Sequence, residues 1–157
     1  MASENIEKYR ANAEIYKGHD VCKQKIIEFQ AELGFPTGIL RLKDIIEFGY
    51  NRQAGFAWIL QKEKTEHRFK KLGTTVSYDT EITTLAEHHK MAKITGIKSK
   101  EFLIWVATSD MYISDPASGK INFKTYTGLG RTLPVSGFLL EDEQEEKRRK
   151  EVSWAYM

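Results

Sequence analysis

The chain has 157 residues, of which 41% are hydrophobic and 29% are charged. This length and composition predict one folded domain with its own core, and they exclude a disordered chain. The formal net charge is only +2, far from the basic surface of a nucleic-acid-binding protein, so we expect no nucleic-acid partner. The single cysteine, Cys22, excludes an internal disulfide and suits a reducing compartment.

The N-terminal stretch MASENIEKYR is polar and charged from Ser3 onward, unlike a secretory signal. No apolar run approaches the roughly 20 residues that a membrane-spanning helix needs. We therefore expect a soluble, cytoplasmic protein, or one that is peripheral at membranes.

Two helices are predicted in the first 34 residues. Ile6, Tyr9, Ala13 and Tyr16 fall at helical spacing, and Gly18 ends that helix. The second helix is predicted over residues 20–33, with Asp20 as its N-cap and Gly34 at the position that follows a helix end. One face of this helix is apolar and consists of Cys22, Ile26, Phe29 and Leu33.

From Gly38 onward the pattern becomes that of β-strands. The segments GILRLKDIIEFGY and GFAWILQ flank NRQA, and this arrangement predicts a β-hairpin. The next segment, KTEHRFKKL, is predicted to continue in an extended conformation. VSYDTEIT has the two-residue side-chain alternation of a β-strand. KITGIKSK is predicted as a turn or short strand, and FLIWV as a central strand covered on both faces. DPASG has the residues of a turn and precedes KINFKTY and RTLPVSGFLL. The fold class is therefore α+β, mainly β: a small β-barrel or strongly curved antiparallel sheet with N-terminal helices.

The predicted domain covers residues 1–140. Residues 141–157 are predicted to form a charged C-terminal helix or tail, because EDEQEEKRRKE places three glutamates four residues before a base.

No motif indicates a metal, a cofactor or an arranged nucleophile. His88 and His89 are adjacent and would point to opposite faces of a strand, so we expect no metal site and no cofactor. Ser109 and Ser114 each precede an aspartate, but the G-x-S-x-G elbow is missing. A catalytic triad stays open as an alternative, because triads are recognised by geometry. Glu47 lies between two apolar residues and is predicted to face outward from its strand.

Aromatic residues recur in the strand-like segments. Inside a curved sheet they either fill the core or line an apolar pocket, which we expect beside Trp58 and Trp105. The candidate ligand-binding residues are Trp58, Tyr78, Trp105, Phe123 and Phe138.

A basic stretch follows the first hairpin. Its bases fall on one side of an extended segment and either contact anionic membrane headgroups or protect an edge strand. The candidate membrane-contact residues are Lys62, Lys64, Arg68 and Lys70.

The blocks GILRLKDIIEFGYNRQAGFAWILQK, VSYDTEIT, KITGIKSKEFLIWV and INFKTYTGLGRTLPVSGF resemble the plant family called domain of unknown function five-three-eight. The resemblance runs from about Tyr16 to Leu139, and its nearest branch is the smaller-trichomes-with-variable-branches-like proteins. The chain differs from that pattern at Gly128, Gly130 and Gly137, where the family often has larger or hydroxyl residues.

The resemblance implies a plant protein with a small β-barrel-like domain preceded by helix. It also implies proposed functions: the family has been likened to bactericidal permeability-increasing lipid-binding proteins, a chlorophyll-hydrolysing esterase activity has been suggested, and roles in stress response and trichome development are named. We expect a non-enzymatic domain that binds an apolar or amphipathic small molecule, lipid or pigment-like. The alternatives are an esterase-like hydrolase of a lipophilic ester and a protein-interaction module without ligand, whose protein partners the sequence does not name.

Overall fold

The computed structural model describes residues 3–140. The predicted C-terminal helix or tail, 141–157, lies outside the described residues. In chain order, the elements of the described part are α1 (Glu4–Tyr9), β1 (Glu14–Lys17), α2 (His19–Glu32), β2 (Ile45–Asn51), β3 (Phe56–Gln61), β4 (Thr65–Phe69), β5 (Thr74–Glu87), β6 (Lys90–Glu101), β7 (Ile104–Tyr112), the 3₁₀ helix η1 (Pro116–Ser118), β8 (Lys120–Thr125), β9 (Gly130–Pro134) and the 3₁₀ helix η2 (Val135–Phe138).

The strands form one antiparallel sheet in the order β1-β2-β3-β5-β6-β7-β8-β9, and β4 pairs with β5 beside this path. The path starts at β1 and ends at β9, and no pairing among the described residues closes it. The expected α+β, mainly β class with a strongly curved sheet is confirmed. Of the two predicted architectures, the molecule has the curved sheet rather than the closed barrel.

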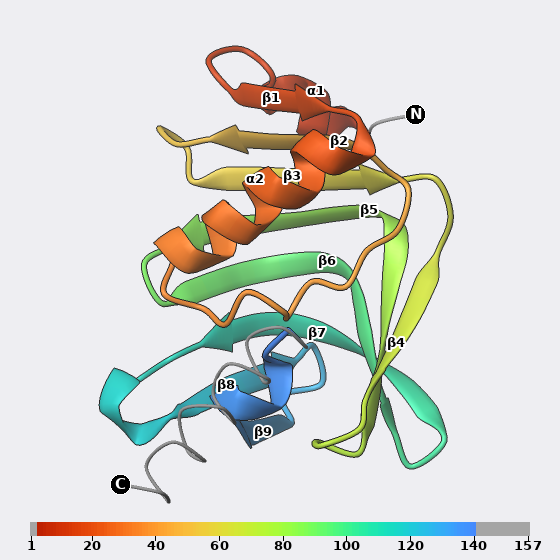
Figure 1. The fold of residues 1–157 in the computed structure, drawn as a ribbon, viewed down its shortest axis with the longest axis vertical. Coiled ribbons are helices and arrows are strands. Elements are labelled where there is room, and N and C mark those ends of the chain that lie inside the picture. Colours follow the sequence, from red (N-terminus) through yellow and green to blue (C-terminus); the bar gives the residue numbers. More distant parts are fainter. Residues whose placement is uncertain (1–2, 141–157) are drawn as a thin grey trace, which may run out of the picture.

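The curvature comes from β5 and β6, which are the two longest strands. One half of β5 pairs with β3 and the other half with β4. In Figure 1, β5 and β6 run horizontally beneath α2 and then turn downward, where β4 joins β5. The β5–β6 register breaks at this turn, between Tyr78 and Thr83. Residues 79–82 of β5 face a single residue of β6, Gly96, so the turn is a large bulge that bends the sheet.

Gly96 is required at this bend, because its φ is +84° and a Cβ would lie 2.2 Å from the carbonyl oxygen of Glu81. We expect Gly96→Ala to lower the free energy of unfolding by about 2–3 kcal/mol, from left-handed strain and steric overlap together. A urea titration measures the loss. Gly119→Ala is the matched control: its φ is +69° with nothing near the new Cβ, so strain alone acts and the loss should be smaller. Equal losses would show that the contact with Glu81 is unimportant.

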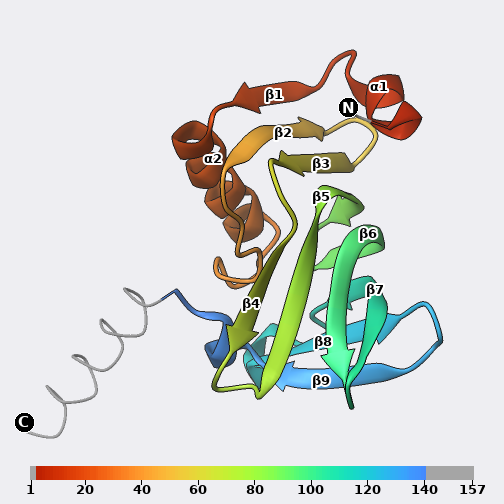
Figure 2. The same ribbon diagram turned by 90° about the vertical axis from the view of Figure 1, so that its right-hand side faces the viewer.

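Helix α2 covers one face of the sheet, in front of β2 and β3 (Figures 1 and 2). The four residues of its predicted apolar face are all buried, which confirms the predicted helix and its inner side. Gly34 has a φ of +83°, as expected after a helix end. The predicted N-cap was wrong: the helix begins at His19, its N-cap is Gly18, and Asp20 lies in the first turn.

The first predicted helix is shorter than its spacing indicated. Helix α1 ends at Tyr9, and the following residues form β1 instead. Ile15 and Tyr16 pair with Gly49 and Phe48 of β2. Ladder hydrogen bonds to the sheet therefore override a helical periodicity that extends over only a few turns.

The other strand predictions have mixed outcomes. The NRQA hairpin between β2 and β3 and the DPASG turn are confirmed. The KTEHRFKKL segment is extended over Thr65–Phe69, but its last three residues form the β4–β5 turn. KITGIKSK was predicted as a turn or short strand, but it belongs to the 12-residue strand β6. FLIWV was predicted as a buried central strand and this is wrong, since Phe102 and Leu103 form the turn of the β6–β7 hairpin and are 97% and 88% exposed.

The sheet has apolar residues on both sides. The larger cluster lies under α2, and a smaller one consists of Ile6, Phe56 and Trp58 beneath α1. Gly49 of β2 lies against the Trp58 ring, where any side chain would overlap the indole. Strand β3 is therefore covered on both faces.

Glu47 does not face solvent, contrary to the sequence interpretation. Its side chain is buried and accepts a hydrogen bond from Trp58 Nε1 at 2.8 Å, and Arg10 Nη2 lies 2.9 Å from Oε2. Burial alone would raise the pKa of Glu47, but the hydrogen bonds from Arg10 and Trp58 outweigh it and hold this pKa below its ordinary value of 4.5. The carboxylate therefore joins the chain segment around α1 to the sheet.

Candidate functional site

The main cavity lies below the bend of the sheet and has a volume of about 590 Å³. Its walls come from the lower parts of β5 and β6, from β7, β8 and β9, and from η2. The bend makes this space, because it carries the lower parts of β5 and β6 away from α2 (Figure 2). A flat sheet of the same strands would leave no enclosed volume.

The interior of the cavity is mainly apolar, with the hydroxyl residues Thr74, Ser99, Thr108 and Thr125 also in the wall. Alternate residues of each strand point to the same face, so the wall collects one set of side chains from each strand. The wall includes Val76, Ile97, Met111, Phe123, Leu133 and Phe138. The rings of Phe123 and Phe138 are 5.4 Å apart between centroids and form one end of this wall. Such a lining suits hydrocarbon or aromatic groups.

Charged side chains border the cavity. Arg131 Nη1 donates a hydrogen bond to Glu101 Oε1 at 3.0 Å, and Lys100 is exposed beside them. Phe102 and Leu129 also line the cavity although they are 97% and 71% exposed. A residue that is both exposed and part of the wall must stand at an opening, so these residues mark the mouth.

Two of the five predicted ligand-binding aromatics, Phe123 and Phe138, line this cavity. Trp58 and Tyr78 are 1% and 0% exposed and belong to the packed core. Tyr78 donates its hydroxyl hydrogen bond to the carbonyl of Ile39. These two residues support the sheet rather than a cavity of useful size.

The cavity does not lie beside the two tryptophans named from the sequence. The space next to Trp58 measures only about 10 Å³, which is about the smallest volume that holds one water molecule. Trp105 precedes the wall residue Val106 and therefore points to the opposite face of β7. Its ring lies 5.8 Å from Lys100 Nζ.

A family model described as "Protein of unknown function, DUF538" matches residues 26–139. The chain belongs to this family. Neither the curated proteins nor the solved structures contain a significant match. The DUF538 match begins within α2 and ends just after η2, so it contains every residue that lines the cavity. Helix α1 and strand β1 precede it.

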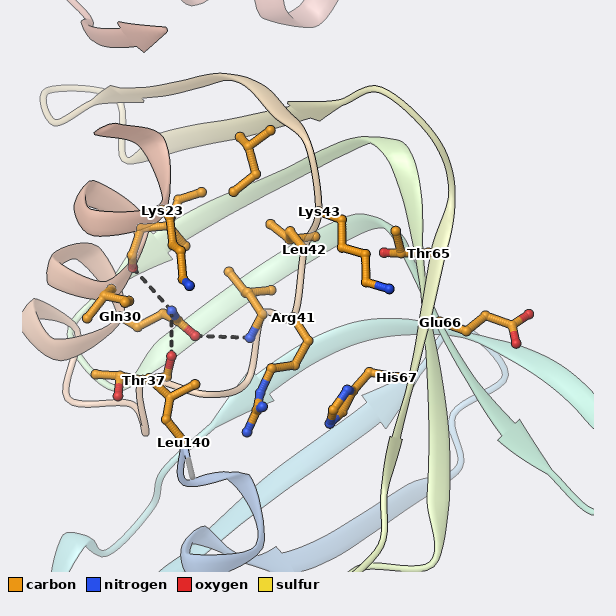
Figure 3. A pocket seen from close by; sticks show the side chains of 14 residues that line it. Lys23, Gln30, Thr37, Arg41, Leu42, Lys43, Thr65, Glu66, His67 and Leu140 are labelled. Carbon is orange, nitrogen blue, oxygen red and sulfur yellow. Dashed lines mark hydrogen bonds between the residues drawn. The ribbon is translucent and has the colours of Figure 1, made fainter. Parts of the chain in front are cut away.

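This DUF538 chain has a second, smaller pocket of about 200 Å³ between α2, the segment 37–45 and β4 (Figure 3). Gln30 fills its floor: its amide nitrogen donates to the carbonyls of Ile26 and Thr37, and its oxygen accepts from Leu40 N. Arg41 donates to the carbonyls of Gly38 and Leu139. These polar groups already make hydrogen bonds that attach the segment 37–45 to α2 and to the end of the described chain. We therefore assign this pocket a structural role.

The predicted basic face is exposed, but only one of its four members lies in a strand. Arg68 belongs to β4, whereas Lys62 and Lys64 precede it and Lys70 begins the β4–β5 turn. Lys62 and Lys70 therefore lie near opposite ends of β4, and Lys70 lies on the side of the cavity.

The two serines weighed as nucleophiles lie outside the cavity wall. Ser109 is 7% exposed, and its one hydroxyl proton is shared between two acceptors, Asp110 Oδ2 at 3.0 Å and the Lys124 carbonyl at 3.2 Å. Ser114 Oγ accepts from Asn122 Nδ2. Within residues 3–140, no group of three His, Cys, Asp or Glu side chains could hold a metal ion, and no histidine lines the cavity.

Sequence reasoning missed Arg131, Leu129 and Phe102 as site residues. They come from two turns and one edge strand, and the bend of β5 and β6 brings them together. The run of apolar residues after Glu101 was the one sequence feature that could have indicated an exposed apolar turn at the site. A run of this length is equally typical of a buried strand.

Proposed function

We propose that this protein binds an apolar or amphipathic small molecule, of lipid or pigment type, in the cavity below the bend. The observation that carries the proposal is the volume of about 590 Å³ with its apolar wall, because small-molecule sites occupy about 300–1,000 Å³ and are lined mainly by apolar and aromatic groups. The protein acts as a binding domain and not as an enzyme.

The charged border favours an amphipathic ligand. A carboxylate or phosphate at the mouth would meet Arg131, while its hydrocarbon part would contact Phe123 and Phe138 inside. Arg131 is held by Glu101, so its guanidinium is oriented before the ligand arrives, which lowers the cost of ordering it.

The proposal is tested with a substitution that reduces the volume of the cavity. Val76→Phe adds a ring from β5 into the wall, where aromatic residues suit a strand. We expect the affinity for cis-parinaric acid, a fluorescent fatty acid, to fall about tenfold or more, because the ring occupies the space of the chain. Fluorescence titration of the purified protein measures the dissociation constant.

Thr75→Phe is the matched control, since residue 75 is adjacent in β5 and points to the opposite face. This variant should bind the probe as the unmodified protein does. If Val76→Phe binds with unchanged affinity and remains folded, the cavity is not the ligand site.

The esterase-like hydrolase and the interaction module without ligand stay predictions, as no specific contact favours either. The cytoplasmic location, the plant origin, the trichome-like branch and the roles in stress and trichome development also stay predictions. No helix among residues 3–140 has both the length and the apolarity to cross a membrane.

A further inference from the structure

The exposed apolar residues of this protein are concentrated at the mouth of the cavity. Seven large apolar side chains in the described residues are exposed, and five of them lie in two turns. Phe102, Leu103 and Ile104 lie at the tip of the β6–β7 hairpin, and Tyr126 and Leu129 in the β8–β9 turn. We call Phe102, Leu103 and Ile104 the apolar tip. Since Phe102 and Leu129 also line the cavity, both turns adjoin its opening.

The backbone of the apolar tip has positive φ angles, which strain large side chains and lower the stability of the fold. Phe102 and Leu103 have φ of +50° and +80°, and they connect Glu101 to its partner Ile104 as a two-residue hairpin turn. Turns of this kind favour Asn-Gly, because most side chains are strained at positive φ. Neither local conformation nor burial explains a phenylalanine and a leucine here, so their contribution is to contacts outside the chain.

Bases outnumber acids in the strands and turns that form the mouth. The segments 70–76, 97–106 and 129–133, which border the mouth, contain five bases and one acid. The acid, Glu101, is paired with Arg131. Among the described residues no ion pair engages the other four bases, which are Lys70, Lys71, Lys98 and Lys100. Apolar side chains at the tip, with lysines on β6 and in the β4–β5 turn, suit an anionic lipid surface, where apolar groups enter the acyl region and bases contact the headgroups.

We propose that the apolar tip inserts into the interface of an anionic membrane and places the mouth of the cavity against the lipid. An apolar ligand then passes between bilayer and cavity without crossing water. The proposal rests on the proposed function and names the source of its ligand. Lipid suits the tip better than a protein partner, because the tip is a narrow hairpin end in Figures 1 and 2 rather than a broad apolar face.

The deciding variant is the double change Phe102→Asn and Leu103→Gly, which gives the turn its preferred residues and removes the apolar contact. The full chain is mixed with phosphatidylcholine vesicles that contain about 30 mol% phosphatidylserine, and the bound fraction is measured by sedimentation. We expect binding at least about tenfold weaker than for the unmodified protein, with a thermal midpoint that is no lower. Equal binding of both proteins would overturn the proposal.

The matched control is the double change Val21→Thr and Ile46→Thr, which removes the two other large exposed apolar residues, 50% and 53% exposed. It should bind the vesicles as the unmodified protein does. Loss of binding in this control as well would mean that surface apolarity in general, and not the tip, drives the association, which would overturn the proposal.

The basic residues are tested in two pairs. Lys98→Ser with Lys100→Ser should weaken binding to the anionic vesicles, whereas Lys62→Ser with Lys64→Ser should leave it nearly unchanged. The second pair belongs to the basic face predicted from the sequence and precedes β4, away from the mouth. The reverse result would place the membrane contact on that face and overturn the assignment to the tip.

Membrane docking and ligand binding are separable. The Phe102→Asn/Leu103→Gly variant should bind dissolved cis-parinaric acid with little change but take it up from vesicles at least about tenfold more slowly. Val76→Phe should dock to vesicles normally without taking up the probe. If Val76→Phe docked to vesicles but neither the variants nor the unmodified protein bound the probe, the proposed ligand binding would be refuted and the membrane docking would stand. If light scattering showed dimers of the unmodified protein that the tip variant lacks, and vesicle binding were absent, the tip would be a protein interface instead.

Discussion

Replacing Glu47 by leucine is expected to lower the free energy of unfolding by about 2–4 kcal/mol, because the buried Trp58 Nε1–H is left without an acceptor and the partly exposed Arg10 keeps only its ion pair with Glu7. The carboxylate is 5% exposed. Without it, the Trp58 Nε1–H loses its acceptor in the core, and Arg10 Nη2 loses the partner it holds at 2.9 Å. Chemical denaturation at pH 7 measures the loss. A change below about 1 kcal/mol would show that water replaces the carboxylate fully.

Glu47→Gln separates charge from hydrogen bonding, since the amide oxygen can still accept from Trp58. This variant should lose less stability than Glu47→Leu at pH 7. The pKa of Glu47 is held below 4.5 in the folded protein, so the unfolded state binds the proton more readily and the stabilisation exists above the unfolded pKa. It is lost as the pH falls through the folded pKa.

The difference in stability between the unmodified protein and Glu47→Gln should therefore be largest near neutral pH and shrink in acid. Urea titrations of both proteins from about pH 7 to about pH 3.5 measure it. A difference that is constant across this range would mean that the charge of Glu47 contributes nothing.

Phe29→Ala is expected to cost about 3–5 kcal/mol, the usual effect of emptying a phenylalanine site in a core. Phe29 is 4% exposed, and its ring meets those of Phe48 and Tyr50 edge-on, at 5.3 and 4.8 Å between centroids. These contacts fasten α2 to β2, so their loss should be felt by the whole fold. A denaturant titration gives the value.

Gln24→Ala is the control on the same helix, because Gln24 is exposed and such changes usually stay within about 0.5 kcal/mol. A loss below about 1 kcal/mol for Phe29→Ala would mean that α2 is not part of the cooperative unit.

The sequence predicted the inner side of α2 correctly because four apolar residues at helical spacing can be buried only together. The helix prediction was wrong for Ile15 and Tyr16. Their short segment fits a helical period, but its backbone gains more stability from hydrogen bonds to β2. The prediction that Glu47 faces outward was wrong for a related reason. A carboxylate between two apolar residues is normally outward-facing, and only the approach of Arg10 and Trp58 makes its burial favourable.

The candidate site was predictable in its chemistry but not in its place. Aromatic residues on curved strands indicated an apolar pocket, and Phe123 and Phe138 do line one. The two tryptophans do not, because the side of a strand that meets a cavity depends on register, and a shift of one residue reverses it. The bulge opposite Gly96 changes the β5–β6 register in the middle of both strands, which no periodicity in the sequence reveals.

Composition, periodicity and turn residues by themselves determined the mainly β fold class, the position of α2, the hairpin at NRQA and the turn at DPASG. These depend on local preferences and on the burial of one face, which neighbouring residues specify. The tertiary structure alone decided that the sheet stays open, that β5 and β6 bend, and that FLIWV starts at an exposed tip. Those features depend on contacts between residues far apart in the chain, such as Gly96 with Glu81 and Arg131 with Glu101, and local sequence does not contain them.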